Sequence, residues 1–178
     1  MTLLLISMGG HQMLTQQTLK EYLHYDPETG VFTWLVDRKG KAKAGSVAGL
    51  KHHSGYIYIK LFGKRYAAHR LAFLYMKGYL PKFVDHKNCI RCDNWFDNLR
   101  ECSRSDNNCN AVKRRDNKSG VKGVYYHKQR GRWAAQIKHN KVCYHLGLFD
   151  SVAEAEAVVK KKREELHREF TNHGEAYE

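Results

Sequence analysis

Long apolar runs are missing from the sequence. Near the N-terminus the longest is residues 3–6, which is too short for the apolar core of a signal peptide or for a membrane-spanning helix. No cleavage-site pattern and no lipidation motif accompany it. We therefore expect a soluble, cytoplasmic protein without a membrane partner. The natural start, at Met1, Met8 or Met13, stays open, and residues 1–13 are expected to be poorly ordered.

Acidic residues are scarce relative to basic ones. Among 178 residues, 31 are Lys or Arg and 18 are Asp or Glu, which gives a formal net charge of +13. This excess favours a polyanionic partner, either nucleic acid or an anionic membrane surface, and the absence of a membrane segment favours nucleic acid. The hydrophobic fraction of 42% excludes wholesale disorder. The length suits one domain or two small ones.

A disulfide framework is not expected, because the five cysteines are an odd number in a chain without an export signal. Cys89 and Cys92 have the spacing of a zinc knuckle. Cys102 and Cys109 could complete a structural zinc site of four thiolates. The alternative is that these cysteines are small buried residues, and the sequence leaves both interpretations open. Cys143 lies in a predicted strand and is expected to be inert.

Periodicity divides the chain into three parts. In the first, residues 14–81, helices are predicted over residues 15–23 and 69–79. Between them, residues 55–61 alternate as a β-strand does and lead into a hairpin turn. Residues 37–51 are basic and rich in glycine, and they predict a mobile loop.

The second part, residues 84–110, predicts a small ββα unit. It has a short strand that ends at Val84, a loop rich in turn formers at residues 88–93, a second short strand, and a helix that begins within residues 103–110. We assign the first two parts to one domain, residues 14–112, followed by a polar linker at residues 113–120.

The third part predicts three successive strands and a helix. The strands are expected at residues 121–126, 132–139 and 142–149, separated by turn-like residues. Ser151 and Glu154 form a capping box, which opens a helix through about residue 170.

Four residues of the second part suit metal-assisted cutting of a phosphodiester. His86 could deprotonate water, since its side chain titrates near neutral pH. Asp85 is its neighbour, and adjacent residues of an extended segment point to opposite faces, so Asp85 could hold a cation while His86 faces water. Asn98 could hold the loop and orient the imidazole. Asn107 could supply a neutral oxygen ligand.

This segment resembles the HNH (ββα-metal) endonuclease family in its His-Asn-Asn form. The resemblance is carried by Val84-Asp85-His86, Asp93-Asn94, Asn98-Leu99-Arg100 and Ser105-Asp106-Asn107-Asn108. The run Ala68-His69-Arg70-Leu71-Ala72-Phe73 is similar to one that is common in phage homing endonucleases of this family.

The HNH resemblance implies a role for each of the four residues. His86 would be the general base, Asn98 the structural middle residue of the catalytic group, and Asp85 and Asn107 the metal ligands. Asparagine at the last ligand position favours one Mg²⁺ or Mn²⁺ ion over zinc at the catalytic centre. Whether Asn107, Asn108 or Asn110 is that ligand stays open.

The third part resembles the AP2 DNA-binding domain through Lys122-Gly123-Val124 and residues 131–137 and 146–150. That family folds as a three-stranded antiparallel sheet packed on one helix, and its sheet enters the major groove. Here alternation turns Trp133, Ala135 and Ile137 toward the helix. Residues of the opposite face are predicted to contact DNA, namely Lys122, Tyr125, His127, Arg132, Gln136, Lys138 and His145.

Together these patterns predict an α+β protein with a small N-terminal sheet-and-helix region, a ββα-metal nuclease unit, and an AP2-like domain at residues 121–174. The predicted function is a site-specific homing endonuclease, encoded by a bacteriophage and acting on double-stranded DNA in the host cytoplasm. One ββα unit per chain makes nicking natural unless the protein dimerises, and the oligomeric state and target sequence stay open. The alternatives are a non-catalytic AP2-type regulator with a vestigial or zinc-stabilised ββα unit, and a protein built around structural zinc.

Overall fold

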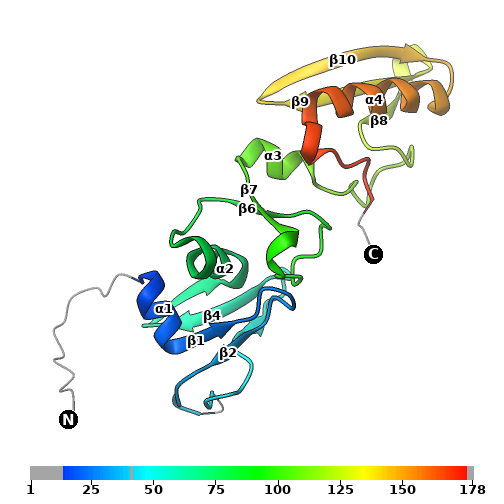
Figure 1. Ribbon diagram of the computed structural model, residues 1–178. Coiled ribbons are helices and arrows are strands. Elements are labelled where there is room, and N and C mark those ends of the chain that lie inside the picture. The colour runs from blue at the N-terminus through cyan, green and yellow to red at the C-terminus, as the bar shows by residue number, and fades with distance from the viewer. Residues whose placement is uncertain (1–13, 41, 176–178) are drawn as a thin grey trace, which may run out of the picture.

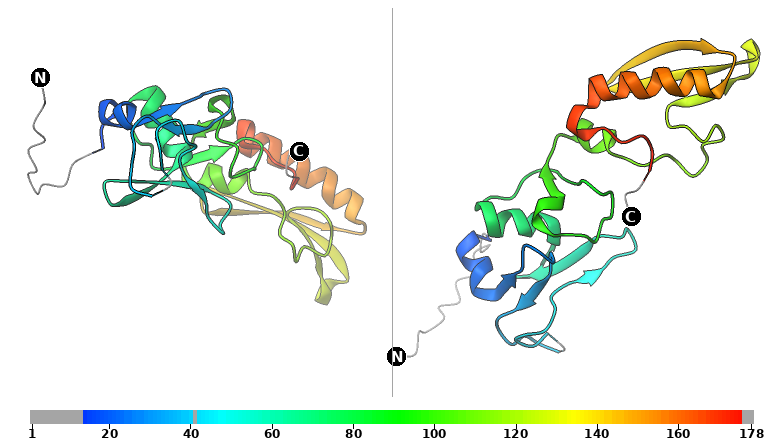
Figure 2. Two further views of the ribbon diagram at one scale, coloured as in Figure 1. Left: turned by 90° about the horizontal axis from the view of Figure 1, so that it is seen from below. Right: turned by 45° about the vertical axis from the view of Figure 1, so that its right-hand side comes forward.

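The computed structural model describes residues 14–40 and 42–175 and has the predicted mixture of helices and strands. Figure 1 shows two lobes, and Figure 2 shows helix α3 (Arg104–Cys109) where they meet. The predicted disorder of residues 1–13 lies outside the described residues. Within the described part of the chain, no helix is long and apolar enough to cross a membrane.

The N-terminal lobe is organised around helix α2, whose residues Leu71, Ala72 and Leu74 are buried against the strands. Its elements are α1 (Gln16–Tyr22), β1 (Leu23–Tyr25), β2 (Phe32–Trp34), β3 (Leu50–Lys51), β4 (Ile57–Leu61), β5 (Lys64–Ala67) and α2 (Ala68–Lys77). β1 pairs antiparallel with β2, while β3, β4 and β5 form a separate antiparallel sheet. The second half of the predicted loop at residues 37–51 belongs to this fold, since Ala48 is buried and its N–H donates to the carbonyl of Phe32.

The turn between β1 and β2 packs against the loop that carries the candidate active site. Gly30 N–H donates to the carbonyl of Asp26 (2.8 Å), and Gly30 has φ of +73°, a conformation that favours glycine. The carbonyl of Pro27 accepts from Phe96 N–H (2.7 Å). A turn distant in sequence therefore supports the segment between residues 86 and 98.

The ββα unit consists of β6 (Val84–His86), the 3₁₀ turn η1 (Phe96–Asn98), β7 (Leu99–Glu101) and α3. β6 and β7 pair antiparallel, so that Asp85 lies opposite Arg100. Helix α3 begins at a capping box in which Ser103 accepts from Asp106 N–H, and the Asp106 carboxylate accepts from Ser103 N–H.

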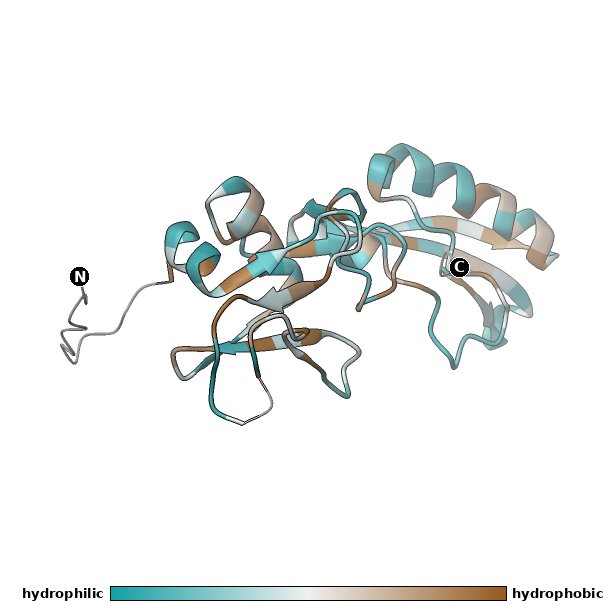
Figure 3. Ribbon diagram, turned by 60° about the horizontal axis from the view of Figure 1, so that its bottom comes forward, coloured by the Kyte–Doolittle hydropathy of each residue, from teal (hydrophilic) through white to brown (hydrophobic). Residues whose placement is uncertain are grey.

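The C-terminal lobe is a three-stranded antiparallel sheet in the order β10-β9-β8, covered on one face by helix α4. Its elements are β8 (Val124–His127), η2 (Lys128–Arg130), β9 (Arg132–His139), β10 (Val142–Phe149), α4 (Val152–His167) and η3 (Arg168–Phe170). Ala135 and Ile137 of β9 are buried with Ala155 and Val159 of α4. Most apolar residues of α4 lie in its first half, and its second half is mostly hydrophilic (Figure 3).

The two lobes are tied together by polar contacts near α3. The ammonium group of Lys122 donates to the carbonyls of Cys109 (2.8 Å) and Asn172 (3.1 Å), and to that of Ala111. Asn140 N–H donates to Ser105 Oγ (3.1 Å). These contacts place the end of the ββα unit against the sheet of the C-terminal lobe.

Candidate active site

Asp85 and His86 are adjacent on β6, and each is only 4% exposed. Burial of two polar residues in a three-residue strand is costly unless both find partners. Each side chain does find them, and the two sets are separate. His86 contacts the loop that precedes β7, whereas Asp85 contacts β7 and the end of α3.

The imidazole of His86 is held through one nitrogen. Its Nε2 lies 3.1 Å from Oδ1 of Asn94, which can only accept a hydrogen bond, so Nε2 carries the proton. Asn94 is 1% exposed, its Nδ2 donates to the carbonyl of Cys92, and its own carbonyl accepts from the Tyr25 hydroxyl (2.6 Å). The remaining nitrogen of His86, Nδ1, therefore holds the lone pair that a general base needs.

The surroundings of His86 favour its neutral form. Burial lowers the pKa of His86, and the hydrogen bond with Asn94 and the charge of Asp85 offset part of that shift. His69 of α2 packs edge-on against the His86 ring, with centroids 5.1 Å apart, and burial lowers its pKa to about 3. A neutral neighbour of this kind fixes the ring of His86 without adding charge to the site.

Asn98 closes the loop rather than orienting the imidazole. Its Nδ2 donates to the carbonyl of Asp93 (2.7 Å) and to Oδ1 of Asn88 (3.0 Å), and its Oδ1 accepts from Asn88 N–H (3.0 Å). The sequence predicted that Asn98 would both hold the loop and orient the ring. The orienting contact belongs to Asn94 instead, because the Asn98 carboxamide is used by the loop.

The Asp85 carboxylate accepts from two side chains. Arg100 forms an ion pair with Oδ2, through Nε at 2.9 Å and Nη2 at 2.8 Å. Asn110 Nδ2 lies 3.0 Å from both carboxylate oxygens and 2.7 Å from the carbonyl of His86. The guanidinium of Arg100 also stacks on the Phe170 ring at 3.9 Å, so a residue of the C-terminal lobe reaches the partner of Asp85.

A divalent ion at this centre would need hard oxygen donors, and Asp85 with Asn110 fits that requirement. Rotation of the Asn110 carboxamide by 180° would turn Oδ1 toward the Asp85 carboxylate and the carbonyl of His86, an approach of oxygens that is unfavourable unless they share a cation. Asn107 is half-buried on α3, and its side chain makes no hydrogen bond within the described residues. Among the three open candidates for the last ligand, Asn110 is the one in contact with Asp85.

The four cysteines predicted as a zinc site do not gather. In the described part of the chain, no three of Cys89, Cys92, Cys102 and Cys109 bring their sulfurs within ligand distance of one another. Cys89 Sγ instead donates to the carbonyl of Asn110 (3.1 Å). Cys109 ends α3, and its sulfur contacts His139 of the C-terminal lobe.

The predicted DNA-contact residues mostly share one face of the C-terminal sheet. Arg132 lies opposite His127 and Gln136 lies opposite His145, so these four side chains project from the same face of the sheet. Tyr125, Ala134 and Lys138 lie on that face as well. Lys122 does not belong there. Its ammonium group donates to three carbonyl groups between the lobes, and burial lowers its pKa to about 8. Lys122 therefore holds the lobes together and is not available to DNA.

Comparison with protein families identifies one segment. Residues 66–109 match the model of the HNH endonuclease family HNH_3. The matched segment includes His69, Asp85, His86 and Asn98, ends one residue before Asn110, and does not reach the C-terminal lobe. No curated protein and no solved structure matches the chain. The match supports an HNH nuclease whose substrate is DNA. HNH nucleases typically use a divalent metal.

Proposed function

We propose that this chain is a site-specific endonuclease of the homing type, which nicks double-stranded DNA with His86 as general base and one Mg²⁺ or Mn²⁺ ion. The observation that carries the proposal is the hydrogen bond between His86 Nε2 and Asn94 Oδ1 beside a buried carboxylate. It fixes the tautomer of a neutral imidazole next to a group that can hold a cation. That arrangement suits activation of water against a phosphodiester.

Each residue then has one task in the reaction. His86 Nδ1 accepts a proton from water, and the charges of Asp85 and Asp93 stabilise the imidazolium that results. Asn94 keeps the ring in one orientation through that step, and Asn98 keeps the loop closed around it. A divalent ion held by Asp85 and an asparagine carboxamide would neutralise the phosphate and the leaving oxygen.

The number of cuts follows from the number of sites. The described chain carries one such unit, centred on His86, and a single unit cuts one strand in each binding event. The exposed sheet face of the C-terminal lobe would hold the duplex while the N-terminal lobe cuts it, since Arg and Lys suit phosphate or guanine and Gln suits adenine.

Plasmid cleavage tests the proposed activity. Wild-type protein incubated with a pooled library of supercoiled plasmids and Mg²⁺ should yield nicked circles, and sequencing of the nicks should map them to one site. EDTA should prevent nicking. If gel shifts show binding while plasmids stay supercoiled with both Mg²⁺ and Mn²⁺, the proposal fails and the non-catalytic DNA-binding regulator is favoured.

The sheet face makes a separate prediction about DNA affinity. Replacing both Arg132 and Lys138 with alanine should weaken DNA binding and reduce the slope of log affinity against log salt by about 1.8, because two phosphate contacts are lost. A matched removal of charge from the helix, Lys160→Ala with Lys161→Ala, should leave the slope nearly unchanged. Fluorescence anisotropy over a salt series measures both. Equal losses in the two variants would show that net charge, and not the sheet face, determines binding.

A further inference from the structure

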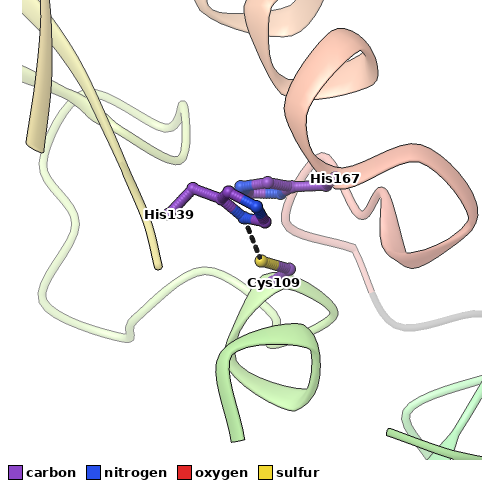
Figure 4. A group of neighbouring side chains, drawn as sticks. All are labelled: Cys109, His139 and His167. Atoms are coloured by element: carbon purple, nitrogen blue, oxygen red, sulfur yellow. Dashed lines mark hydrogen bonds between the residues drawn. The ribbon is translucent and has the colours of Figure 1, made fainter. Parts of the chain in front are cut away.

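A second group of potential metal ligands lies between the two lobes, away from Asp85. Cys109, His139 and His167 are the last residues of α3, β9 and α4, and their ligand atoms all lie within 4.8 Å of one another. Figure 4 shows the two imidazoles above the Cys109 sulfur. Three elements from both lobes therefore end at one point.

His167 has no hydrogen-bond partner that would explain its burial. The residue is 6% exposed, and both of its ring nitrogens are buried without a partner in the described part of the chain. Buried polar groups of this kind are rare in folded proteins unless a ligand, ion or water completes them. The unpaired ring lies beside the ring of His139, with centroids 5.5 Å apart.

The spacing of the group agrees with a tetrahedral zinc ion. Around a tetrahedral ion, Zn–S bonds of about 2.3 Å and Zn–N bonds of about 2.0 Å separate a sulfur ligand from a nitrogen ligand by about 3.5 Å. Cys109 Sγ lies 3.6 Å from His139 Nδ1. The other nitrogen of His139 is 2.9 Å from the Asn140 carboxamide. If that carboxamide rotates, its oxygen accepts a hydrogen bond from the ring N–H and holds the ring as metal-binding imidazoles usually are held.

The donor set differs from that of the proposed catalytic centre. One thiolate and two imidazoles suit a borderline-soft ion such as Zn²⁺, whereas Asp85 with an asparagine suits a hard ion such as Mg²⁺. No further His, Cys, Asp or Glu of the described residues joins the group. Three ligands would leave one of the four positions of a zinc ion open, and His167 also lines a cavity of about 910 Å³.

We infer that Cys109, His139 and His167 bind a zinc ion that fastens α3 to the C-terminal lobe. The ion gives a partner to one of the two unpaired ring nitrogens of His167, and it joins residues that no strand pairing connects. Cys109 is followed directly by Asn110, which contacts Asp85. The zinc ion therefore also fixes the end of α3 beside the candidate active site, a consequence that rests on the proposed function.

Metal binding to the full chain tests this inference. Protein stripped of metal should bind one Zn²⁺ tightly in competition with a chromophoric chelator, and Co²⁺ in its place should give a thiolate-to-cobalt absorption band. Cys109→Ser should remove that band and weaken zinc binding more than about 100-fold, beyond the cost of losing a group that only orients a ligand. His167→Gln should weaken binding and keep the band. Zinc should raise the melting temperature of wild type and not of Cys109→Ser.

Two cysteine variants serve as controls. Cys89→Ser and Cys143→Ser should bind zinc as wild type does, and loss of zinc in Cys89→Ser would instead support the four-cysteine site. Unchanged affinity in Cys109→Ser, or no tight zinc in wild type, overturns the inference. If Cys109→Ser does not fold, Cys89→Ser decides, since its cobalt band must persist. None of these readouts depends on nicking, so failure of the proposed nuclease activity would leave the metal result standing.

Discussion

Replacing His86 with alanine should lower the rate of plasmid nicking by about 10²–10⁴-fold, the range that a positioned general base contributes. The physical reason is that His86 Nδ1 is the free basic nitrogen at the candidate site, while Nε2 is committed to Asn94. The rate is best measured in single turnover with saturating Mg²⁺, so that product release does not mask the chemical step. DNA affinity in a gel shift should stay within a few-fold of wild type, because the sheet face is unchanged.

A matched histidine variant separates loss of the base from loss of a histidine in general. His24 is exposed on β1 and has no part in the proposed mechanism, so His24→Ala should nick at the wild-type rate. Asn94→Ala should fall between the two, since the base stays but its orienting partner is lost, at a cost of about 10–100-fold. If His86→Ala nicks at the wild-type rate, His86 is not the general base and the proposed mechanism is wrong.

Much of the fold could be predicted because each element has an apolar face with its own period. β9 and β10 occupy the residues that alternation predicts, since their inner side chains pack on α4. β8 starts later than predicted, at Val124. The N–H of Val124 donates to the carbonyl of Val121, and Gly123 has φ of +86°. Residues 121–124 therefore form a turn that comes before the strand. Periodicity does not reveal such turns inside an otherwise strand-like run.

The partners at the candidate site could be predicted only in part. Asp85 and His86 are adjacent in sequence, and their separate tasks follow from the geometry of an extended segment. Asn94 and Asn98, in contrast, lie in one loop, and spacing alone does not say which of them faces the imidazole. Asn98 turns inward because the backbone groups of Asn88 and Asp93 need partners, and this leaves Asn94 for the ring.

The group of Cys109, His139 and His167 illustrates a second limit. Spacing in the sequence groups Cys109 with Cys89, Cys92 and Cys102, whereas the histidines near Cys109 lie far along the chain, His139 being 30 residues away. Their proximity arises from the packing of the lobes and from which residue happens to end each element. Lys122 shows the same limit. Its basic character suggested a phosphate contact, but tertiary packing directs it to three carbonyls.

Replacing Gly30 with alanine should destabilise the N-terminal lobe by about 3 kcal/mol or more and should also abolish nicking at temperatures where the variant is still folded. A Cβ atom at Gly30 would overlap the backbone of Asn94 and Trp95 and would lie 2.7 Å from the carbonyl oxygen of Asn94. That carbonyl accepts from the Tyr25 hydroxyl, so the overlap would push away the residue that orients His86. Backbone atoms cannot yield as the end of a flexible side chain can.

Gly63→Ala is the control that isolates the overlap from the backbone conformation. Gly63 has φ of +79°, close to the +73° of Gly30, but a Cβ there would meet nothing within 4 Å. Alanine at Gly63 should therefore cost only the left-handed conformation, about 1–2 kcal/mol, with normal nicking of the folded protein. Urea unfolding measures both stabilities, and nicking is compared at low temperature. Equal destabilisation of the two variants, or normal nicking by Gly30→Ala, would show that the turn between β1 and β2 does not support the catalytic loop.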